Sequence, residues 1–139
     1  MKVLFDTNIL LDVLLKRDPF FDASAQLLAY AEQGKIEGWL CGTTVTTIYY
    51  LLSRTLARKK AVIHLRQLLK ILHISGVTRV VLEDALESGF TDYEDAVLYH
   101  SALHARAEIV LTRNQKDFSE SSLPIYSPAE FLKAEDILK

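Results

Sequence analysis

Val3-Leu4-Phe5-Asp6-Thr7-Asn8-Ile9-Leu10-Leu11 is the stretch of this sequence that decides the fold. A short apolar run typical of a β-strand is followed by a carboxylate, a hydroxyl and an amide, and then by apolar residues at helical spacing. The polar triplet is therefore predicted to lie at the carboxyl end of a strand, the edge of a parallel sheet at which ligands bind. A simpler interpretation makes Asp6 or Thr7 only the N-cap of the following helix, and the triplet alone favours that interpretation.

The composition indicates one domain that spans residues 1–139. Of the 139 residues, 50% are hydrophobic, which is enough for a single sizeable core. The net charge of −2 means that any contact with nucleic acid requires a local basic patch. The lone Cys41 excludes a disulfide framework and a Cys-rich zinc site, and it fits a reducing compartment. Neither a secretion signal nor an apolar run of membrane-spanning length is present, so we expect a soluble cytoplasmic protein.

Predicted strands alternate with predicted helices along nearly the whole chain. Apolar periodicity and turn signals place strands at residues 3–5, 36–41, 73–77, 109–112 and 124–126. Helices are expected at residues 8–15, 18–34, 42–56, 78–89, 92–106 and 127–137, with another that follows the basic triplet 58–60 and ends at residue 72.

Two of these helices carry distinctive signals. Asp18 and Pro19 are the expected cap and first residue of the second helix, and Gly34 is its expected left-handed end. Residues 43–48 are mostly β-branched, so a buried strand competes with the preferred helix there. The alternation of elements predicts a three-layer α/β/α sandwich with a mainly parallel central sheet of about four to five strands.

Four carboxylates distant in sequence are predicted to converge on one edge of this sheet. Asp6 ends the first strand, Asp92 and Asp95 open a late helix, and Asp117 follows the strand at 109–112. Carboxylates so close together repel one another unless a divalent cation offsets their charge, and their hard oxygens suit Mg²⁺ or Mn²⁺. Such a site hydrolyses phosphodiesters. Taken singly, each acid is also an ordinary helix cap, dipole partner or solvated loop residue.

Three blocks of the sequence resemble the signature blocks of PIN-domain proteins. They are Phe5-Asp6-Thr7-Asn8, Asp92-Tyr93-Glu94-Asp95-Ala96 and Thr112-Arg113-Asn114-Gln115-Lys116-Asp117-Phe118, which in order and spacing cover nearly the whole chain. The resemblance implies a PIN-like fold and a metal-dependent ribonuclease similar to the toxins of bacterial type II toxin–antitoxin pairs. By the same resemblance, Asp6, Asp95 and Asp117 are the catalytic and metal-binding acids, with Asp92 as a further ligand or a substitute. Hydrogen-bonding support is expected from Thr7, Asn8, Thr47, Thr112 and Asn114.

The sequence departs from the PIN pattern in one helix. The family usually supplies a glutamate from the helix after the second strand, whereas here that place falls on Thr47 or Thr46. A hydroxyl binds Mg²⁺ far more weakly than a carboxylate, although it can hold a metal-bound water. Glu94 could compensate, but it is predicted to point about one helical step away from Asp95. The departure implies weak metal affinity, a changed substrate or a loss of cleavage.

Basic residues near the predicted acidic edge are candidate RNA contacts. They fall in two groups, which could follow an RNA backbone or simply be solvated. The first group comprises Arg54, Arg58, Lys59 and Lys60, and the second comprises Arg113 and Lys116, which flank Asp117.

Histidine and aromatic side chains give weaker signals. His100 and His104 are four residues apart, but the glutamate of a zinc-protease helix is absent, so a polar stripe is favoured over a metal site. Tyr49, Tyr50 and Trp39 could stack on bases, yet core or dimer-interface positions are favoured.

We therefore predict an endoribonuclease that uses Mg²⁺ or Mn²⁺ and water as the nucleophile. Its expected partners are an RNA substrate, an antitoxin protein and a second copy of the chain. A phosphatase with an aspartyl-phosphate intermediate is disfavoured, because Asn8 stands where that chemistry needs a second acid. The non-enzymatic alternative, favoured by Thr47, is a catalytically weak or inactive module that binds RNA or a partner protein.

Overall fold

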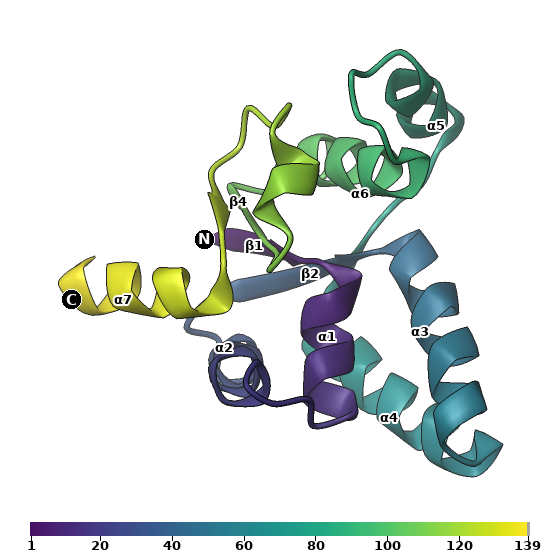
Figure 1. Cartoon of the computed structure of the whole chain (residues 1–139), viewed down its shortest axis with the longest axis vertical. Coiled ribbons are helices and arrows are strands. Elements are labelled where there is room, and N and C mark those ends of the chain that lie inside the picture. The colour runs from purple at the N-terminus through teal and green to yellow at the C-terminus, as the bar shows by residue number, and fades with distance from the viewer. Residues whose placement is uncertain (139) are drawn as a thin grey trace.

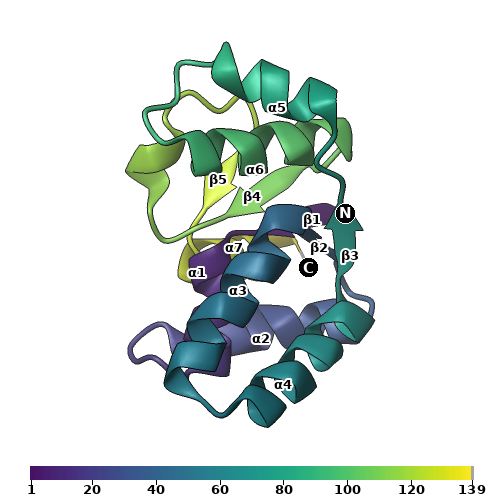
Figure 2. The same ribbon diagram turned by 90° about the vertical axis from the view of Figure 1, so that its right-hand side faces the viewer.

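The computed structural model describes the backbone of residues 1–138 and the side chains of residues 1–134. Its centre is a five-stranded parallel sheet with helices on both faces (Figure 1 and Figure 2). The predicted three-layer α/β/α sandwich is thus confirmed, and Lys139, the last residue of the predicted domain, lies outside the described residues. The strands are β1 (Lys2–Phe5), β2 (Glu37–Cys41), β3 (His73–Ser75), β4 (Ile109–Leu111) and β5 (Ile125–Tyr126). The helices are α1 (Thr7–Leu14), α2 (Phe21–Glu32), α3 (Gly42–Thr55), α4 (Arg58–Ile71), α5 (Arg79–Leu86), α6 (Tyr93–His104) and α7 (Pro128–Leu138), with a short 3₁₀ helix η1 (Gln115–Phe118).

The order of the strands, β3-β2-β1-β4-β5, places β1 in the middle of the sheet. The chain first builds β2 and β3 on one side of β1 and then returns to add β4 and β5 on the other. Phe5 pairs with Leu111 where β1 and β4 end together. A reversal of strand order leaves a crevice beyond the carboxyl ends of the two strands involved. Asp6 and Thr112, the residues that directly follow β1 and β4, stand at this crevice.

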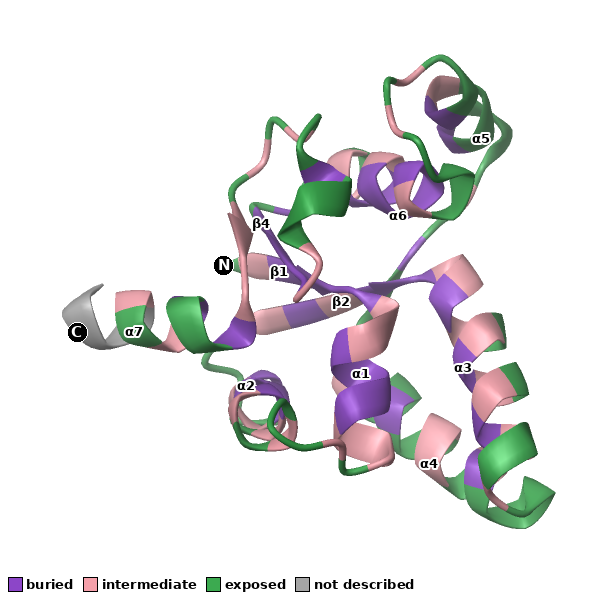
Figure 3. Cartoon of the chain, in the orientation of Figure 1, coloured by how far each residue is buried: buried purple, intermediate pink, exposed green. Residues whose placement is uncertain are grey.

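Two apolar cores cover the two faces of the sheet. Side chains alternate along a strand, so Val3 and Phe5 pack into one core and Leu4 into the other. The larger core joins the sheet to α1, α2, α3, α4 and α7, whereas the smaller core joins it to α5 and α6. Figure 3 shows the resulting burial of β1 and of the inner sides of the helices. These cores hold the strand ends, and therefore the side chains at the crevice, in place.

The start of α2 differs from the prediction. Residues 18–20 form a turn, and the backbone N–H groups of Phe20 and Phe21 both donate to the carbonyl of Arg17. The helix therefore begins at Phe21 without a side-chain cap, and Asp18 does not cap it. Its end agrees with the prediction, because Gly34 has the left-handed backbone (φ 79°) expected of a glycine after a helix.

Two further boundaries differ from the sequence pattern. The basic triplet 58–60 does not precede α4 but forms its first turn, although cations at a helix N-terminus are electrostatically unfavourable. The segment from Asn114 to Ser122, for which no helix was predicted, contains η1.

The β-branched residues after Gly42 form the helix α3, which was preferred over a buried strand. No helix among the described residues is both long and apolar enough to cross a membrane.

Candidate active site

A polar pocket of about 300 Å³ opens at the carboxyl ends of β1 and β4. The first turns of α1, α3 and α6 contribute much of its wall, so the positively polarised ends of these helices lie around it. Most of its lining side chains carry oxygen, and leucines close its inner wall. The lining residues are Asp6, Thr7, Asn8, Leu11, Thr43, Thr44, Thr47, Leu51, Asp92, Glu94, Asp95, Leu98, Asn114 and Asp117.

The structure brings together the acids that the sequence pointed to. Asp6, Asp92, Asp95 and Asp117 all line this one pocket, although the first and last are far apart in the chain. The predicted supporting residues Thr7, Asn8, Thr47 and Asn114 line it too, and Thr112 lies buried beneath Asp6. A purely structural role for the polar triplet after β1 would not require this convergence.

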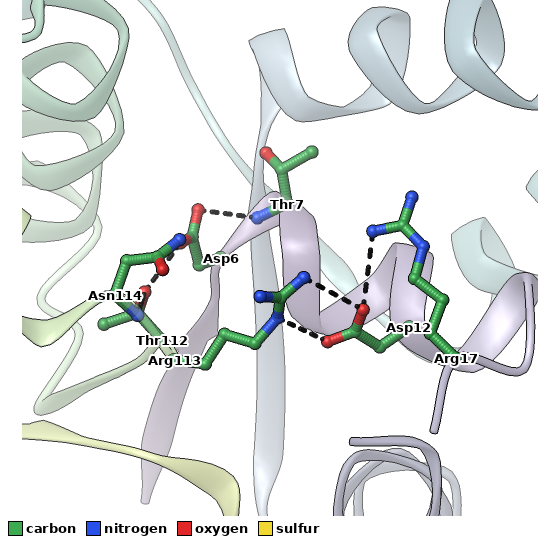
Figure 4. Close-up of polar contacts among 7 residues, drawn as sticks. All are labelled: Asp6, Thr7, Asp12, Arg17, Thr112, Arg113 and Asn114. Atoms are coloured by element: carbon green, nitrogen blue, oxygen red, sulfur yellow. Dashed lines mark hydrogen bonds and ion pairs between the residues drawn. The ribbon is translucent and has the colours of Figure 1, made fainter. Parts of the chain in front are cut away.

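Asp6 is the most firmly held of these acids (Figure 4). Its Oδ1 accepts a hydrogen bond from the backbone N–H of Thr7 at 2.7 Å, and its Oδ2 accepts one from the Thr112 hydroxyl at 2.8 Å. The Thr112 hydroxyl in turn accepts from the backbone N–H of Asn114 at 3.0 Å. Asp6 is buried, so these bonds fix the orientation of a carboxylate that solvent barely reaches. It therefore both caps α1 and presents a defined pair of oxygens to the pocket.

Burial and neighbouring charges raise the pKa of the two most enclosed acids. For Asp6, desolvation is the main cause of the raised pKa, the charges of Asp117 and Glu94 add to it, and the two hydrogen bonds oppose it. The pKa of Asp95 rises from 3.8 to about 7, first through desolvation and then through repulsion by Asp6, Asp92, Asp117 and Glu94. The pocket therefore concentrates negative charge that has no protein cation to balance it among its lining residues.

Asp92 has a structural role in addition to its place in the pocket. Its Oδ1 accepts a hydrogen bond from the backbone N–H of Asp95 at 3.0 Å, which makes it the N-cap of α6. Asp92 therefore has the ordinary helix-cap role that the sequence allowed for it when the four acids are taken singly. The cap fixes the first turn of α6, and that turn carries Glu94 and Asp95 into the pocket.

Glu94 is the one acidic residue of the pocket lining that the predicted site left out. We expected its side chain to point away from Asp95, yet its Oε1 accepts a hydrogen bond from the Thr47 hydroxyl at 3.3 Å, across the pocket from α6 to α3. The Thr47 hydroxyl also points at the carbonyl of Thr43, at 3.1 Å, and shares its single proton between the two acceptors. The only sequence signal for this contact is the combination of a missing acid at 47 and an extra one at 94.

The donor set of the pocket suits a hard divalent cation. Carboxylate, hydroxyl and amide oxygens line it, and these are the ligands that Mg²⁺ and Mn²⁺ prefer. In the part of the chain that the structure describes, no group of three or more Asp, Glu, His or Cys side chains is placed so that it could hold a metal ion as it stands. Asp92, Glu94 and Asp117 are exposed and line the same pocket as Asp6, so their carboxylates would be accessible to a cation that entered it. The residues present therefore fit such a metal.

The predicted basic cluster lies away from the pocket. Arg54 is in the last turn of α3, where it donates to the hydroxyl of Tyr50 at 3.1 Å, and residues 58–60 start α4 beyond it. The pocket is at the opposite end of α3, and a helix of 14 residues is about 20 Å long. The expectation that this cluster adjoins the acidic edge is therefore wrong, and its role in RNA binding stays a prediction.

Arg113 is engaged in an ion pair (Figure 4). Its guanidinium contacts both oxygens of the fully buried Asp12 carboxylate, at 2.8 Å and 3.3 Å, and lies 4.2 Å from the centre of the Phe20 ring. Arg17 contacts the same carboxylate at 3.5 Å. Because Arg113 stands between Thr112 and Asn114, the pair anchors the loop after β4 to α1. We therefore leave Arg113 out of the proposed RNA contacts, while Lys116 is exposed beside Asp117.

The remaining candidates do not join the site. His104 pairs with Asp84 at 3.1 Å, and His100 packs edge-on against Tyr99 and Phe90. The favoured interpretation of the histidines as a polar stripe agrees with these contacts. Tyr50 is 58% exposed and therefore does not belong to the core.

Comparison with known proteins places this geometry in a family. The family model described as PIN domain matches residues 2–116. Ribonuclease VapC1 from Aquifex aeolicus (strain VF5) is 27% identical over 135 residues, which cover 94% of this chain and 92% of the relative.

Solved structures show the same fold. The DNA-bound VapBC structure from Salmonella typhimurium has a TM-score of 0.71 at 14% identity, with 92% of this chain and 98% of that chain covered. A toxin–antitoxin complex from Klebsiella pneumoniae has a TM-score of 0.68 at 24% identity, with 91% of this chain and 97% of that chain covered. The sheet order, the acids gathered beyond β1 and β4, and the match over residues 2–116 agree, and the chain belongs to the PIN-domain family.

Proposed function

We propose that this protein is a cytoplasmic endoribonuclease that hydrolyses RNA phosphodiester bonds with Mg²⁺ or Mn²⁺. The observation that carries the proposal is the meeting of Asp6, Asp95 and Asp117 in one oxygen-lined pocket at the reversal of strand order. The similarity to a protein named as a ribonuclease, along almost the whole chain, supports the choice of RNA as the substrate.

The roles of the residues follow from their positions. Asp6, Asp95 and Asp117 hold the metal, with Asp92 as a further ligand. When bound, the metal supplies an activated water and stabilises the charge on the leaving oxygen. Thr112 and the backbone of Thr7 keep the Asp6 carboxylate in one orientation. The N-termini of α1, α3 and α6 favour an anion in the pocket, and a phosphodiester is such an anion.

We further propose that the protein is the toxin of a type II toxin–antitoxin pair. The solved structures with this fold include proteins described as VapBC and as a toxin–antitoxin complex. Expression of the chain alone should arrest bacterial growth, and co-expression of a small protein encoded beside it should restore growth. We also propose a homodimer, supported by the exposed apolar side chains Val80, Leu82 and Leu86 on α5, and light scattering of the purified protein tests this state.

A cleavage assay tests the enzymatic proposal. A structured RNA is incubated with the protein in Mn²⁺, in Mg²⁺ and in chelator, with single-stranded DNA of the same sequence as a comparison substrate. We expect cleavage of RNA only when metal is present, and its loss in Asp6→Asn and Asp117→Asn. Asp22→Asn, an identical exchange on the exposed first turn of α2, is the matched control and should cleave normally.

One observation favours a second function. By the resemblance to the family, Thr47 or Thr46 falls where an acid is expected, and a PIN-like module without that acid would bind RNA or a partner protein without cutting RNA. RNA binding without cleavage, with the same affinity in wild type and Asp6→Asn, would establish this second function and refute the first.

A further inference from the structure

The α3 side of the pocket presents hydroxyl groups and no carboxylate. α3 contributes Thr43, Thr44, Thr47 and Leu51 to the lining. Thr44 is buried and its hydroxyl contacts that of Thr7 at 3.0 Å, so it is already engaged beneath the pocket. Thr47 is only partly buried, and its hydroxyl donates a hydrogen bond to the Glu94 carboxylate of α6.

Glu94 fills the place in front of Thr47 from the opposite wall. It lies in the first turn of α6, between the capping residue Asp92 and Asp95, and its side chain is long enough to meet the Thr47 hydroxyl on α3. Its charge contributes to the raised pKa of both Asp6 and Asp95. The Glu94 carboxylate therefore contacts Thr47 and lines the same pocket as both of these acids.

The hydrogen bond from Thr47 does not by itself explain a carboxylate at this position. A neutral glutamine would accept the same hydrogen bond from Thr47 without adding charge to a pocket in which the acids already repel one another. The N-terminus of α6 and solvent offset part of this repulsion, and a cation in the pocket would offset more of it. The contact with Thr47 also turns the carboxylate inward, although Glu94 itself is exposed and is free to point into solvent.

We propose that Glu94 supplies one more acid to the metal site, from α6, in place of the acid that α3 lacks. Thr47 is then a positioning residue, since its hydroxyl directs the Glu94 carboxylate toward the pocket. This inference rests on the proposed function, because it assigns a further ligand to the same metal.

Calorimetric titration of the chelator-treated protein with Mn²⁺ tests the assignment without depending on cleavage. Glu94→Gln keeps an oxygen for Thr47 but removes the charge, and should weaken Mn²⁺ binding by at least about tenfold, the scale for groups that support a metal site. Glu32→Gln, the same exchange at the exposed end of α2, is the matched control and should leave affinity unchanged. Thr47→Val should weaken binding by about threefold, through loss of one hydrogen bond.

A rescue variant separates ligation from a general effect of charge. Adding Thr47→Glu to Glu94→Gln moves the carboxylate to the α3 side of the same contact. If a carboxylate at either position binds the same metal ion, the double variant should recover at least about half of the lost Mn²⁺-binding free energy. Recovery together with the Glu94→Gln defect supports the inference. Wild-type affinity in Glu94→Gln, or a defect that Thr47→Glu does not relieve, overturns it.

The Asp6→Asn variant distinguishes this inference from the proposed function. If Asp6→Asn abolishes Mn²⁺ binding while Glu94→Gln binds normally, the metal site stands and Glu94 is not part of it. If wild type and Asp6→Asn bind Mn²⁺ equally, or neither binds it, the proposed metal-dependent function fails and the role of Glu94 fails with it.

Discussion

Replacement of Asp95 by asparagine should stabilise the metal-free protein. The pKa of Asp95 rises from 3.8 to about 7 because its carboxyl is partly desolvated and faces the other acids of the pocket. The unfolded chain thus releases this proton near pH 3.8, whereas the folded chain keeps it until about pH 7. As pH rises through that window, the unfolded state holds fewer protons, so the ionised carboxyl favours unfolding. Asparagine has nearly the same shape and never ionises.

The size of the effect follows from the shift. A rise in pKa from 3.8 to about 7 corresponds to about 4 kcal/mol against the ionised form. Solvent still reaches this side chain, and screening reduces the effect to about 1–2 kcal/mol. For a domain of this size, that difference raises the melting temperature by about 3–7 °C.

Thermal unfolding in chelator at two pH values measures this effect. At about pH 8 the Asp95→Asn variant should melt above wild type, and at about pH 5 the gap should narrow, because wild-type Asp95 is then protonated in the folded state. Asp22→Asn, on the exposed first turn of α2, controls for the exchange itself. Equal melting temperatures at both pH values, or a gap that grows on acidification, would refute the argument that Asp95 is crowded by its neighbours.

Saturating Mn²⁺ should reverse the order of the two proteins. A ligand that binds only the folded state adds RT ln(1 + [L]/Kd) to stability, which is about 2.7 kcal/mol at a hundredfold excess over Kd. Wild type gains this contribution, and Asp95→Asn loses most of it because it has lost a ligand. An undiminished gain in Asp95→Asn would show that Asp95 does not bind the metal, and would move that role to Asp92.

Three further outcomes are expected. Removal of the charges of residues 58–60 should weaken RNA binding and flatten its salt dependence, because fewer counterions are released; an unchanged slope would make this cluster a solvated helix start. Arg113→Gln should lower the free energy of unfolding in urea by about 3 kcal/mol, because it leaves the buried Asp12 carboxylate without its closest cation; a loss below about 1 kcal/mol would contradict that role. Thr112→Val removes the hydroxyl that donates to Asp6, and should weaken Mn²⁺ binding by about tenfold, whereas unchanged affinity would show that this bond does not orient the ligand.

The architecture was predictable because its signals are local. Strands that are buried on both faces read as short apolar runs, and the residues that follow them read as turns or helix caps. The polar triplet that begins at Asp6 combined both signals, so it fixed the first strand, the first helix and the edge of the sheet where they meet. Once the sheet is parallel, the ends of its strands must share that edge, and the convergence of Asp6 with Asp95 and Asp117 follows from topology.

Helix starts that depend on tertiary structure were not predictable in the same way. Asp18 and Pro19 carry the residue types of a helix start, yet the chain uses them in a turn that positions Phe20 against Arg113. The first turn of α4 contains the basic triplet 58–60, against the preference of the helix dipole. In both places the residue types near the helix start do not predict the residue at which the helix begins.

The threonine at position 47 also has to be interpreted together with residues that are distant in the sequence. A position-by-position comparison with the family pattern shows a threonine at position 47 in place of an acid. The same comparison does not point to Glu94 as a substitute, because helical spacing predicts that the side chains of Glu94 and Asp95 point in different directions. That comparison treats each helix separately and ignores how far a side chain reaches. The ends of α3 and α6 flank one pocket, and a glutamate spans it where an aspartate would not. A metal ion is held by oxygen atoms at suitable positions, whichever helix supplies them, and on the proposed assignment an acid on α6 does what an acid on α3 does elsewhere in the family.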